Sequence, residues 1–137
     1  MRPLSLLLAA FLLTVASTPC LAQEHTKEPI PKVKQQIDEK KAVLLDVREQ
    51  EEWDKGHVEG AVLVPLSELG KKSKDASFVK ELEKKLPKDQ PIYCHCAKGQ
   101  RAILAGGVLT KLGYDVRPLK PGYKELIDAG FPAAKKP

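Results

Sequence analysis

The sequence predicts an α/β domain in which a central parallel sheet is flanked by helices on both faces. Its 137 residues, 42% hydrophobic and 30% charged, suffice for one modest folded domain. Strand-like and helix-like segments alternate along the chain, which is typical of parallel strands joined by right-handed crossovers. The clearest strand is Ala42–Val47, an apolar run interrupted only by Asp46 near its end, as expected for a strand buried on both faces.

The remaining elements follow from local patterns. Val33 and Ile37 lie four residues apart and predict a short amphipathic helix ending near Lys41, since Pro29 and Pro31 disfavour an earlier start. Further strands are expected at residues 62–64, 91–95 and 114–119, and further helices at 77–86, 101–112 and from 123 to Gly130.

Within the helix 101–112, the adjacent Gly106 and Gly107 indicate close packing of the helix backbone against the sheet. In sheets of this kind, sites lie beyond the carboxyl ends of the strands. The loop that joins the strand 91–95 to this helix is therefore the first place to look for chemistry.

The first 22 residues are predicted to be a signal peptide and not part of the fold. A short, positively charged start is followed by the apolar run 4–15, and small residues precede a cleavage position after Ala22. The apolar run is too short for a comfortable transmembrane span. The alternatives are an uncleaved N-terminal anchor and a lipoprotein modified at Cys20.

We therefore expect an exported protein, periplasmic in the first instance and otherwise extracellular. Behind the signal peptide 1–22, a flexible lead-in is expected at residues 23–31, the folded domain at 32–132 and a C-terminal tail at 133–137. No stable membrane insertion is expected after signal cleavage.

The composition argues against a nucleic-acid ligand and against a fold held together by disulfides. Aromatic residues make up 5% of the chain, and its lysine runs are interleaved with acidic residues, so a nucleic acid is not an expected ligand. The three cysteines are too few for a disulfide-stapled fold. The oligomeric state stays open.

The segment that carries the chemistry is Ile92–Arg101, a strand followed by a tight turn with Gly99 and the start of a helix. A cysteine at the end of the strand, Cys96, lies beneath the free N–H groups of the turn and of the first helical turn. These donors favour an anion, so Cys96 is expected to be a thiolate at neutral pH. Lys98 and Arg101 add positive charge at the rim.

With these residues the chain resembles a single-domain rhodanese, a thiosulfate sulfurtransferase of the exported kind. The resemblance rests on Leu45–Arg48, on Glu52-Trp53 and on the run Gly56-His57-Val58 with Gly60-Ala61. The loop Cys96–Arg101 resembles the active-site loop of the family. The match extends over residues 30–132, and both signatures occur in the right order.

The resemblance implies a persulfide mechanism that needs no cofactor and no metal. Cys96 would take the outer sulfur of a small anionic donor such as thiosulfate and pass it to a thiophilic acceptor such as cyanide. The substrate would be bound by the rest of the loop, namely Ala97, Lys98, Gly99, Gln100 and Arg101. Cys96 to Arg101 counts six residues, the sulfurtransferase length, whereas related phosphatases have a loop one residue longer.

Several interpretations remain open beside this one. Cys94 is either a packed structural cysteine, a resolving thiol for Cys96 or, together with His95, part of a metal site. The rival functions are accordingly a thiol redox protein and a non-catalytic rhodanese module that binds a partner. His57 is expected to be a structural hydrogen-bonding residue.

Buried polar contacts are expected for Asp46 and Arg48, which would hold the loops around the site. The chain departs from the family at Pro121-Gly122-Tyr123, where many members have two glycines followed by a tryptophan. Because residues there often border the mouth of the site, the identity of the acceptor stays open.

Overall fold

The computed structural model describes residues 23–136, so the expected signal peptide lies outside the described residues. Within them, a four-stranded parallel sheet has the strand order β2-β1-β3-β4. The strands are β1 (Val43–Asp46), β2 (Val62–Leu63), β3 (Ile92–His95) and β4 (Val116–Pro118). The α/β class with a parallel sheet is therefore confirmed.

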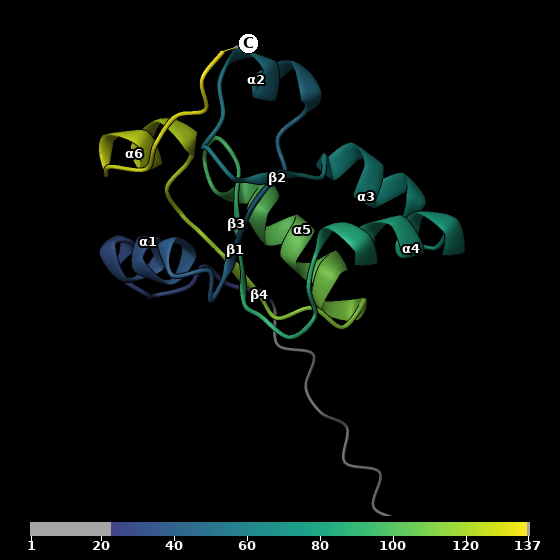
Figure 1. Cartoon of the computed structure of the whole chain (residues 1–137). Helices are drawn as coiled ribbons and strands as arrows, with labels where there is room; N and C mark the ends of the chain where they lie inside the picture. Colours follow the sequence, from purple (N-terminus) through teal and green to yellow (C-terminus); the bar gives the residue numbers. More distant parts are fainter. Residues whose placement is uncertain (1–22, 137) are drawn as a thin grey trace, which may run out of the picture.

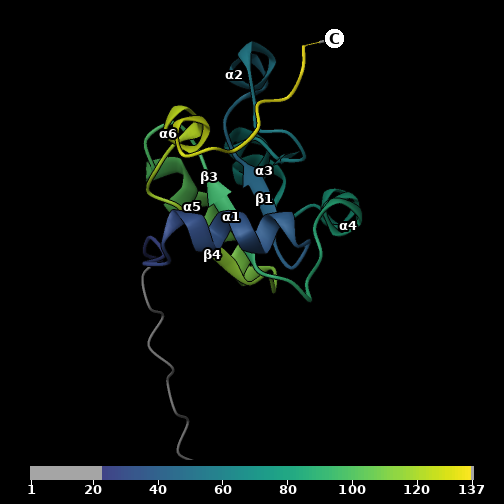
Figure 2. The ribbon, with the colours of Figure 1, turned by 60° about the vertical axis from the view of Figure 1, so that its left-hand side comes forward.

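Helices cover both faces of the sheet (Figures 1 and 2). One face carries α3 (Leu66–Lys72), α4 (Ala76–Lys85) and α5 (Gln100–Lys111). The opposite face carries α1 (Ile30–Asp38) and α6 (Tyr123–Asp128). The short helix α2 (Gln50–Lys55) lies beyond the end of the sheet. None of the helices described between residues 23 and 136 is long and apolar enough to cross a membrane.

Two hydrophobic cores form because successive strand residues point to opposite faces. In β1, Leu45 contributes to the core under α3, α4 and α5, whereas Leu44 contributes to the core under α1 and α6. In β3, Cys94 contributes to the core under α3, α4 and α5, whereas Tyr93 contributes to the core under α1 and α6. This alternation explains why every residue of β3 is buried.

The N-terminal part of the domain differs from the expectation. The first helix begins at Ile30, with Pro29 as its N-cap and Pro31 in its first turn, where a proline loses no helical hydrogen bond. The segment expected to be a flexible lead-in contacts the domain instead. Thr26 N donates to Pro118 O at 2.8 Å, and Glu28 accepts hydrogen bonds at 2.6 Å from the Tyr93 hydroxyl and from Arg117.

The expected C-terminal tail also begins inside the fold. Ala133 forms an antiparallel bridge with Val58, and Ala134 N donates to His57 O at 2.9 Å. These bonds tie the end of the chain to the loop after α2.

Two helices were not expected from the sequence, because neither has an apolar stripe. In α2 no residue is buried, and the helix is stabilised by a capping box between Glu49 and Glu52. In α3 only Leu69 is fully buried. Hydrophobic periodicity cannot detect helices of this kind.

The two adjacent glycines of α5 have different surroundings. A Cβ at Gly106 would lie 2.9 Å from the Pro118 side chain in β4, so this glycine permits the close packing that was expected. A Cβ at Gly107 would meet nothing within 4 Å, so the expectation is wrong for this position.

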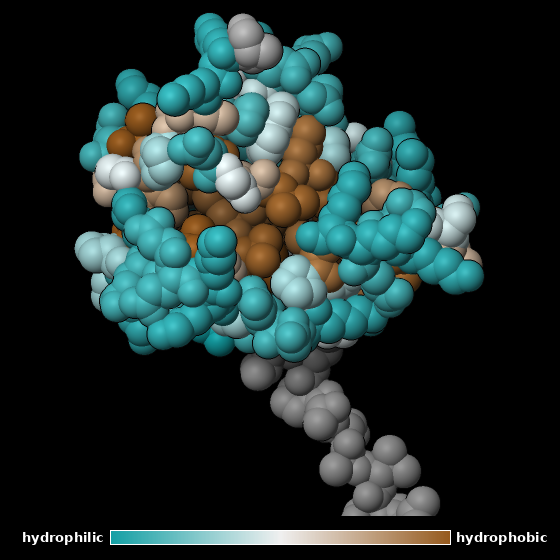
Figure 3. Space-filling model, in the orientation of Figure 1, coloured by the Kyte–Doolittle hydropathy of each residue, from teal (hydrophilic) through white to brown (hydrophobic). Residues whose placement is uncertain are grey.

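The edge strand β2 has only two residues and therefore leaves part of β1 unpaired on that side. Leu45 and Asp46 pair with β2, whereas Val43 and Leu44 precede the paired stretch and line a hollow of about 460 Å³. An exposed apolar band with hydrophilic side chains around it is visible on the face shown in Figure 3.

We expect Leu109→Ala to lower the free energy of unfolding by about 2–5 kcal/mol, because the Leu109 side chain is fully buried under the sheet. Leu104→Ala, on the same helix, should change it by less than about 0.5 kcal/mol, because Leu104 is 60% exposed. Urea unfolding of the two variants measures the difference. Equal effects would contradict the placement of α5.

Candidate active site

The site is placed by the register between β1 and β3. Asp46 pairs with His95, so the two strands end side by side at their carboxyl ends. The loops that follow, with Arg48 on one and Cys96 on the other, therefore begin at the same edge of the sheet. Tyr123 of α6 reaches this edge as well, because its N–H donates to Cys96 O at 3.1 Å.

Cys96 lies at the N-terminal end of α5, and its side chain is almost fully buried. Gly99 N donates to Cys96 Sγ at 3.1 Å. Gly99 is the N-cap of α5 and has a positive φ of 93°, a left-handed conformation that glycine adopts without strain. The free N–H groups at the start of this helix favour negative charge on the sulfur or on a ligand beside it.

The chain after β4 closes over the loop from the other side. A Cβ at Gly122 would lie 1.9 Å from Ala97 O, so the two backbones are in direct contact there. A Cβ at Gly99 would lie 2.9 Å from Lys120 O. The departure from the family pattern at residues 121–123 is therefore located directly against the loop Cys96–Arg101.

Asp46 and Arg48 form a buried ion pair, as the sequence indicated. The Arg48 guanidinium donates from Nε and Nη2 to the Asp46 carboxylate at 2.7–3.0 Å, and Nη2 also donates to Gly56 O at 2.9 Å. The same guanidinium lies 4.5 Å from the centre of the Tyr123 ring. This pair links β1, the end of α2 and the start of α6.

Arg101 was expected to attract an anionic donor, but its guanidinium is engaged by Glu52. Nη1 and Nη2 donate to the two carboxylate oxygens of Glu52 at 2.6 and 2.9 Å. The hydrogen bonds from Arg101 lower the pKa of Glu52 from 4.5 to about 2, against the opposing effect of partial burial. Glu52 thus neutralises part of the charge that the loop presents.

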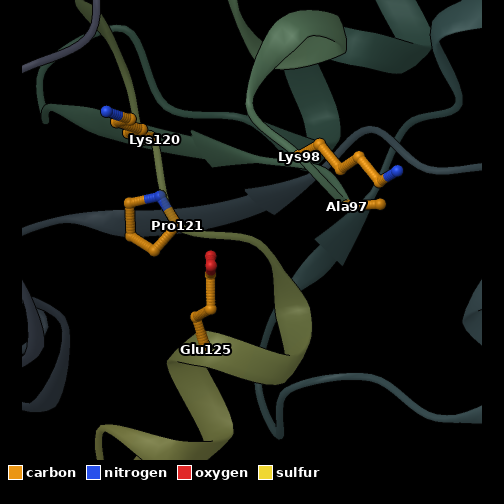
Figure 4. A pocket seen from close by; sticks show the side chains of 5 residues that line it. All are labelled: Ala97, Lys98, Lys120, Pro121 and Glu125. Atoms are coloured by element: carbon orange, nitrogen blue, oxygen red, sulfur yellow. The ribbon is translucent and has the colours of Figure 1, made fainter.

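Two adjoining hollows open at the loop. The first, about 320 Å³, is lined by residues of the loop alone: Cys96, Ala97, Lys98, Gln100 and Arg101. The second, about 340 Å³, shares Ala97 and Lys98 with the first and is shown in Figure 4. Of the six loop residues proposed from the sequence, only Gly99 lines neither hollow, and it contributes its N–H group to the sulfur.

Cys94 lies in the core under α5 and is fully buried. Burial raises the pKa of its thiol well above the ordinary value, and the nearby Cys96 and Asp46 add to the shift. Both cysteines are free thiols. These observations favour the interpretation of Cys94 as a packed structural residue.

His95 is a buried residue on the other side of the strand from Cys96. Its Nδ1 lies 3.3 Å from Cys96 O, and its Nε2 lies 3.6 Å from Asp46 Oδ2 without a hydrogen-bond partner. Burial lowers the pKa of His95, so its neutral form is favoured. Among residues 23–136, no group of three or more His, Cys, Asp or Glu side chains is arranged to hold a metal ion.

His57 has the structural role expected from the sequence. Its ring stacks on Trp53 with the centroids 3.6 Å apart, and its Nδ1 lies 3.1 Å from Trp53 O.

Two residues near the site were missed as site residues. They are Glu52 and His25, whose Nε2 lies 3.0 Å from Gly99 O. No local pattern could reveal His25, since it is separated from Gly99 by 74 positions in the sequence.

The fold and the site therefore define a class of protein: a small parallel α/β domain with a buried cysteine in the loop that precedes a helix. The sequence profile of the Rhodanese-like domain matches residues 30–129, so this chain belongs to the Rhodanese-like domain family.

Solved structures agree with this assignment. A rhodanese-related protein from Thermoplasma volcanium is 27% identical with a TM-score of 0.60, covering 77% of this chain and 93% of the other. The human single-domain sulfurtransferase TSTD1 is also 27% identical with a TM-score of 0.60, covering 72% and 91%.

Relatives are found in bacteria and plants. YrkF of Bacillus subtilis is 31% identical over 74% of this chain, and YqhL of the same organism is 34% identical over 63%. This chain spans 55% of the length of YrkF and 61% of that of YqhL. Thiosulfate sulfurtransferase 16 of Arabidopsis thaliana is 32% identical over 64% of this chain and 76% of the relative. The family thus includes proteins named sulfurtransferases.

We expect Gly122→Ala to destabilise the domain by about 1–3 kcal/mol, because the new methyl group collides with the backbone of the loop Cys96–Arg101 at Ala97. The matched control is Gly107→Ala in α5, where a Cβ has open space and alanine should stabilise the helix by about 0.5–1 kcal/mol. Thermal unfolding compares the two. An unchanged midpoint in Gly122→Ala would contradict the close contact.

The Glu52–Arg101 ion pair should give the stability a defined pH dependence. Because the folded-state pKa of Glu52 is lowered to about 2, the pair stabilises the fold above pH 4.5 and loses this effect as the pH falls from 4.5 towards 2. Both side chains are about one third exposed, so solvent reduces the contribution to about 1 kcal/mol.

Glu52→Gln should therefore lower the free energy of unfolding at pH 7 and approach the wild type below pH 4.5. Urea unfolding from pH 7 to below pH 4.5 measures the difference in free energy of unfolding between this variant and the wild type. The control is Glu51→Gln, a change at an exposed residue of the same helix. A difference that stays constant with pH would refute the assignment.

Proposed function

We propose that this protein is a sulfurtransferase that moves a sulfane sulfur from thiosulfate, or a similar anionic donor, to a thiophilic acceptor through a persulfide on Cys96. The single observation that carries the proposal is the position of Cys96 Sγ, which accepts the Gly99 N–H at the start of α5 beside a hollow formed by the loop. A cysteine so placed can hold negative charge while it attacks an anion.

The reaction has two steps. In the first, the Cys96 thiolate attacks the outer sulfur of thiosulfate, an S–S bond to Cys96 forms, the bond inside the donor breaks, and sulfite leaves with its electron pair. In the second, a nucleophilic acceptor attacks the outer sulfur of the persulfide and Cys96 leaves as a thiolate. The free N–H groups at the start of α5 stabilise the negative charge in both steps.

Positive charge for the donor would come from Lys98 and the α5 N-terminus more than from Arg101. The guanidinium of Arg101 is already paired with Glu52, whereas Lys98 is exposed and lines both hollows. Arg101 with Glu52 would instead hold the rim of the loop in place. The names of relatives such as thiosulfate sulfurtransferase 16 support thiosulfate as a donor to test first.

The remaining expectations stay proposals. Export is inferred from residues 1–22 alone, and with it a periplasmic or extracellular location.

A thiol redox function is disfavoured, because the raised pKa of Cys94 makes it a poor attacking thiol.

We expect the reduced protein to gain the mass of one sulfur atom after incubation with thiosulfate and desalting, and to lose it again when cyanide is added. Cys96→Ser should gain nothing, because the attacking sulfur is absent. Cys94→Ala is the matched control and should load sulfur like the wild type. Intact-mass spectrometry measures each case.

Two results would contradict the proposal. Loss of two hydrogens in place of sulfur gain would favour a Cys94–Cys96 disulfide and hence the redox function. A free Cys96 thiol of unchanged mass would favour a module that only binds a partner.

A further inference from the structure

His95 is a fully buried ionisable residue that the proposed reaction does not use. It ends β3 and directly precedes Cys96 in the chain. Because successive strand residues point to opposite faces, its ring lies on the α6 side of the sheet, whereas the Cys96 side chain belongs to the core under α5. Any influence of His95 on the sulfur therefore passes through the backbone of the loop Cys96–Arg101.

The carbonyl oxygen of Cys96 has two nitrogen neighbours on the α6 side. His95 Nδ1 lies 3.3 Å from it, and Tyr123 N at the start of α6 donates to it at 3.1 Å. The next carbonyl faces the same way, because a Cβ at Gly122 would collide with Ala97 O and lie 2.9 Å from Cys96 O. The first two carbonyl groups of the loop thus face the chain at the start of α6.

The direction of these carbonyl groups sets the direction of the N–H groups that follow them. A trans peptide is planar, and its N–H points opposite to its C=O. The N–H groups of Ala97 and Lys98 therefore point away from α6. On that side Gly99 N donates to Cys96 Sγ, and the hollow of about 320 Å³ opens beside the sulfur.

Only a protonated Nδ1 stabilises this arrangement, because a carbonyl oxygen accepts hydrogen bonds and cannot donate them. The neutral ring of His95 then has its lone pair on Nε2, which finds no hydrogen-bond partner within residues 23–136. The charged groups that face Nε2 are Asp46, whose Oδ2 is 3.6 Å away, and Arg48, which donates to that carboxylate. Burial lowers the pKa of His95 and so favours the neutral ring.

We propose that His95 is a positioning residue for the anion site. As the neutral Nδ1–H tautomer it holds the Cys96 carbonyl group against α6, and it thereby aims the N–H groups of Ala97 and Lys98 at negative charge beside the sulfur. This role rests on the proposed function for the identity of the anion, whereas the geometry of the loop is independent of it.

The tautomer is testable in the wild type, without any substitution. A long-range ¹H–¹⁵N correlation spectrum of the ¹⁵N-labelled protein at pH 7 distinguishes a proton on Nδ1 from one on Nε2, and the signals missing in His95→Asn identify the ring. We expect the proton of His95 on Nδ1. A proton on Nε2, or on both nitrogens, would overturn the inference.

Two substitutions separate the Nδ1 donor from the rest of the ring. The amide nitrogen of Asn takes the place of Nδ1, so His95→Asn can still donate to Cys96 O. The longer Gln places its amide near the position of Nε2, so His95→Gln loses this bond. We expect kcat/KM for thiosulfate to fall about three- to tenfold in His95→Gln, the scale of one hydrogen bond, and by less than about twofold in His95→Asn.

Alkylation of Cys96 gives a second measurement that does not depend on sulfur transfer. The pH dependence of its reaction with iodoacetamide, followed by peptide mapping, reports the pKa of the thiol. We expect the midpoint to rise by about 0.5–1 pH unit in His95→Gln and to stay at the wild-type value in His95→Asn. The control is Val33→Ala, a change at a buried residue of α1 in the core under α1 and α6, which should leave the midpoint unchanged.

These measurements separate the failure of this role from the failure of the proposed function. If His95→Gln loads sulfur and reacts with iodoacetamide like the wild type, the positioning role is refuted and the persulfide function stands. Equal losses in His95→Gln and His95→Asn, or an equal shift in Val33→Ala, would also refute it, because the effect would then be one of packing. If the wild type loads no sulfur, the proposed function fails, and the tautomer and the alkylation midpoints still decide the role of His95.

Discussion

The buried ion pair between Asp46 and Arg48 is the interaction on which the site depends. Arg48 reaches from the end of β1 to Gly56 O beyond α2 and to the ring of Tyr123 in α6. Tyr123 in turn holds the carbonyl of Cys96 through its N–H group. Because a buried charge that loses its partner costs about 3–5 kcal/mol, these loops are constrained as one unit.

The electrostatics of the loop follow from which charges are paired. Arg101 is paired with Glu52, whereas the exposed Lys98 and the start of α5 add positive potential beside Cys96. Such an arrangement places favourable charge close to the sulfur and a rigid ion pair at the rim. If the loop binds an anionic donor as proposed, the pairing of Arg101 with Glu52 reduces its attraction for the anionic product and so favours release.

Much of the fold was predictable because it rests on local signals. The apolar runs of β1 and β3, the stripe of α5 and the glycine after it depend on residues close together in the sequence. The elements that were missed, α2 and α3, bury little and show no periodicity. The start of α1 was misjudged because a proline is tolerated in the first turn of a helix, where its missing N–H would have no helical partner.

The sequence by itself determined the α/β class, the position of Cys96 after a strand and the loop that surrounds it, because strand, turn and helix follow one another there without interruption. Only the tertiary structure decided which charges face the sulfur. Glu52 and Arg101 are 49 positions apart, and Gly99 and His25 are 74 apart. Such contacts arise from the packing of the helices on the sheet and its strand register, and no local pattern of residue types encodes them.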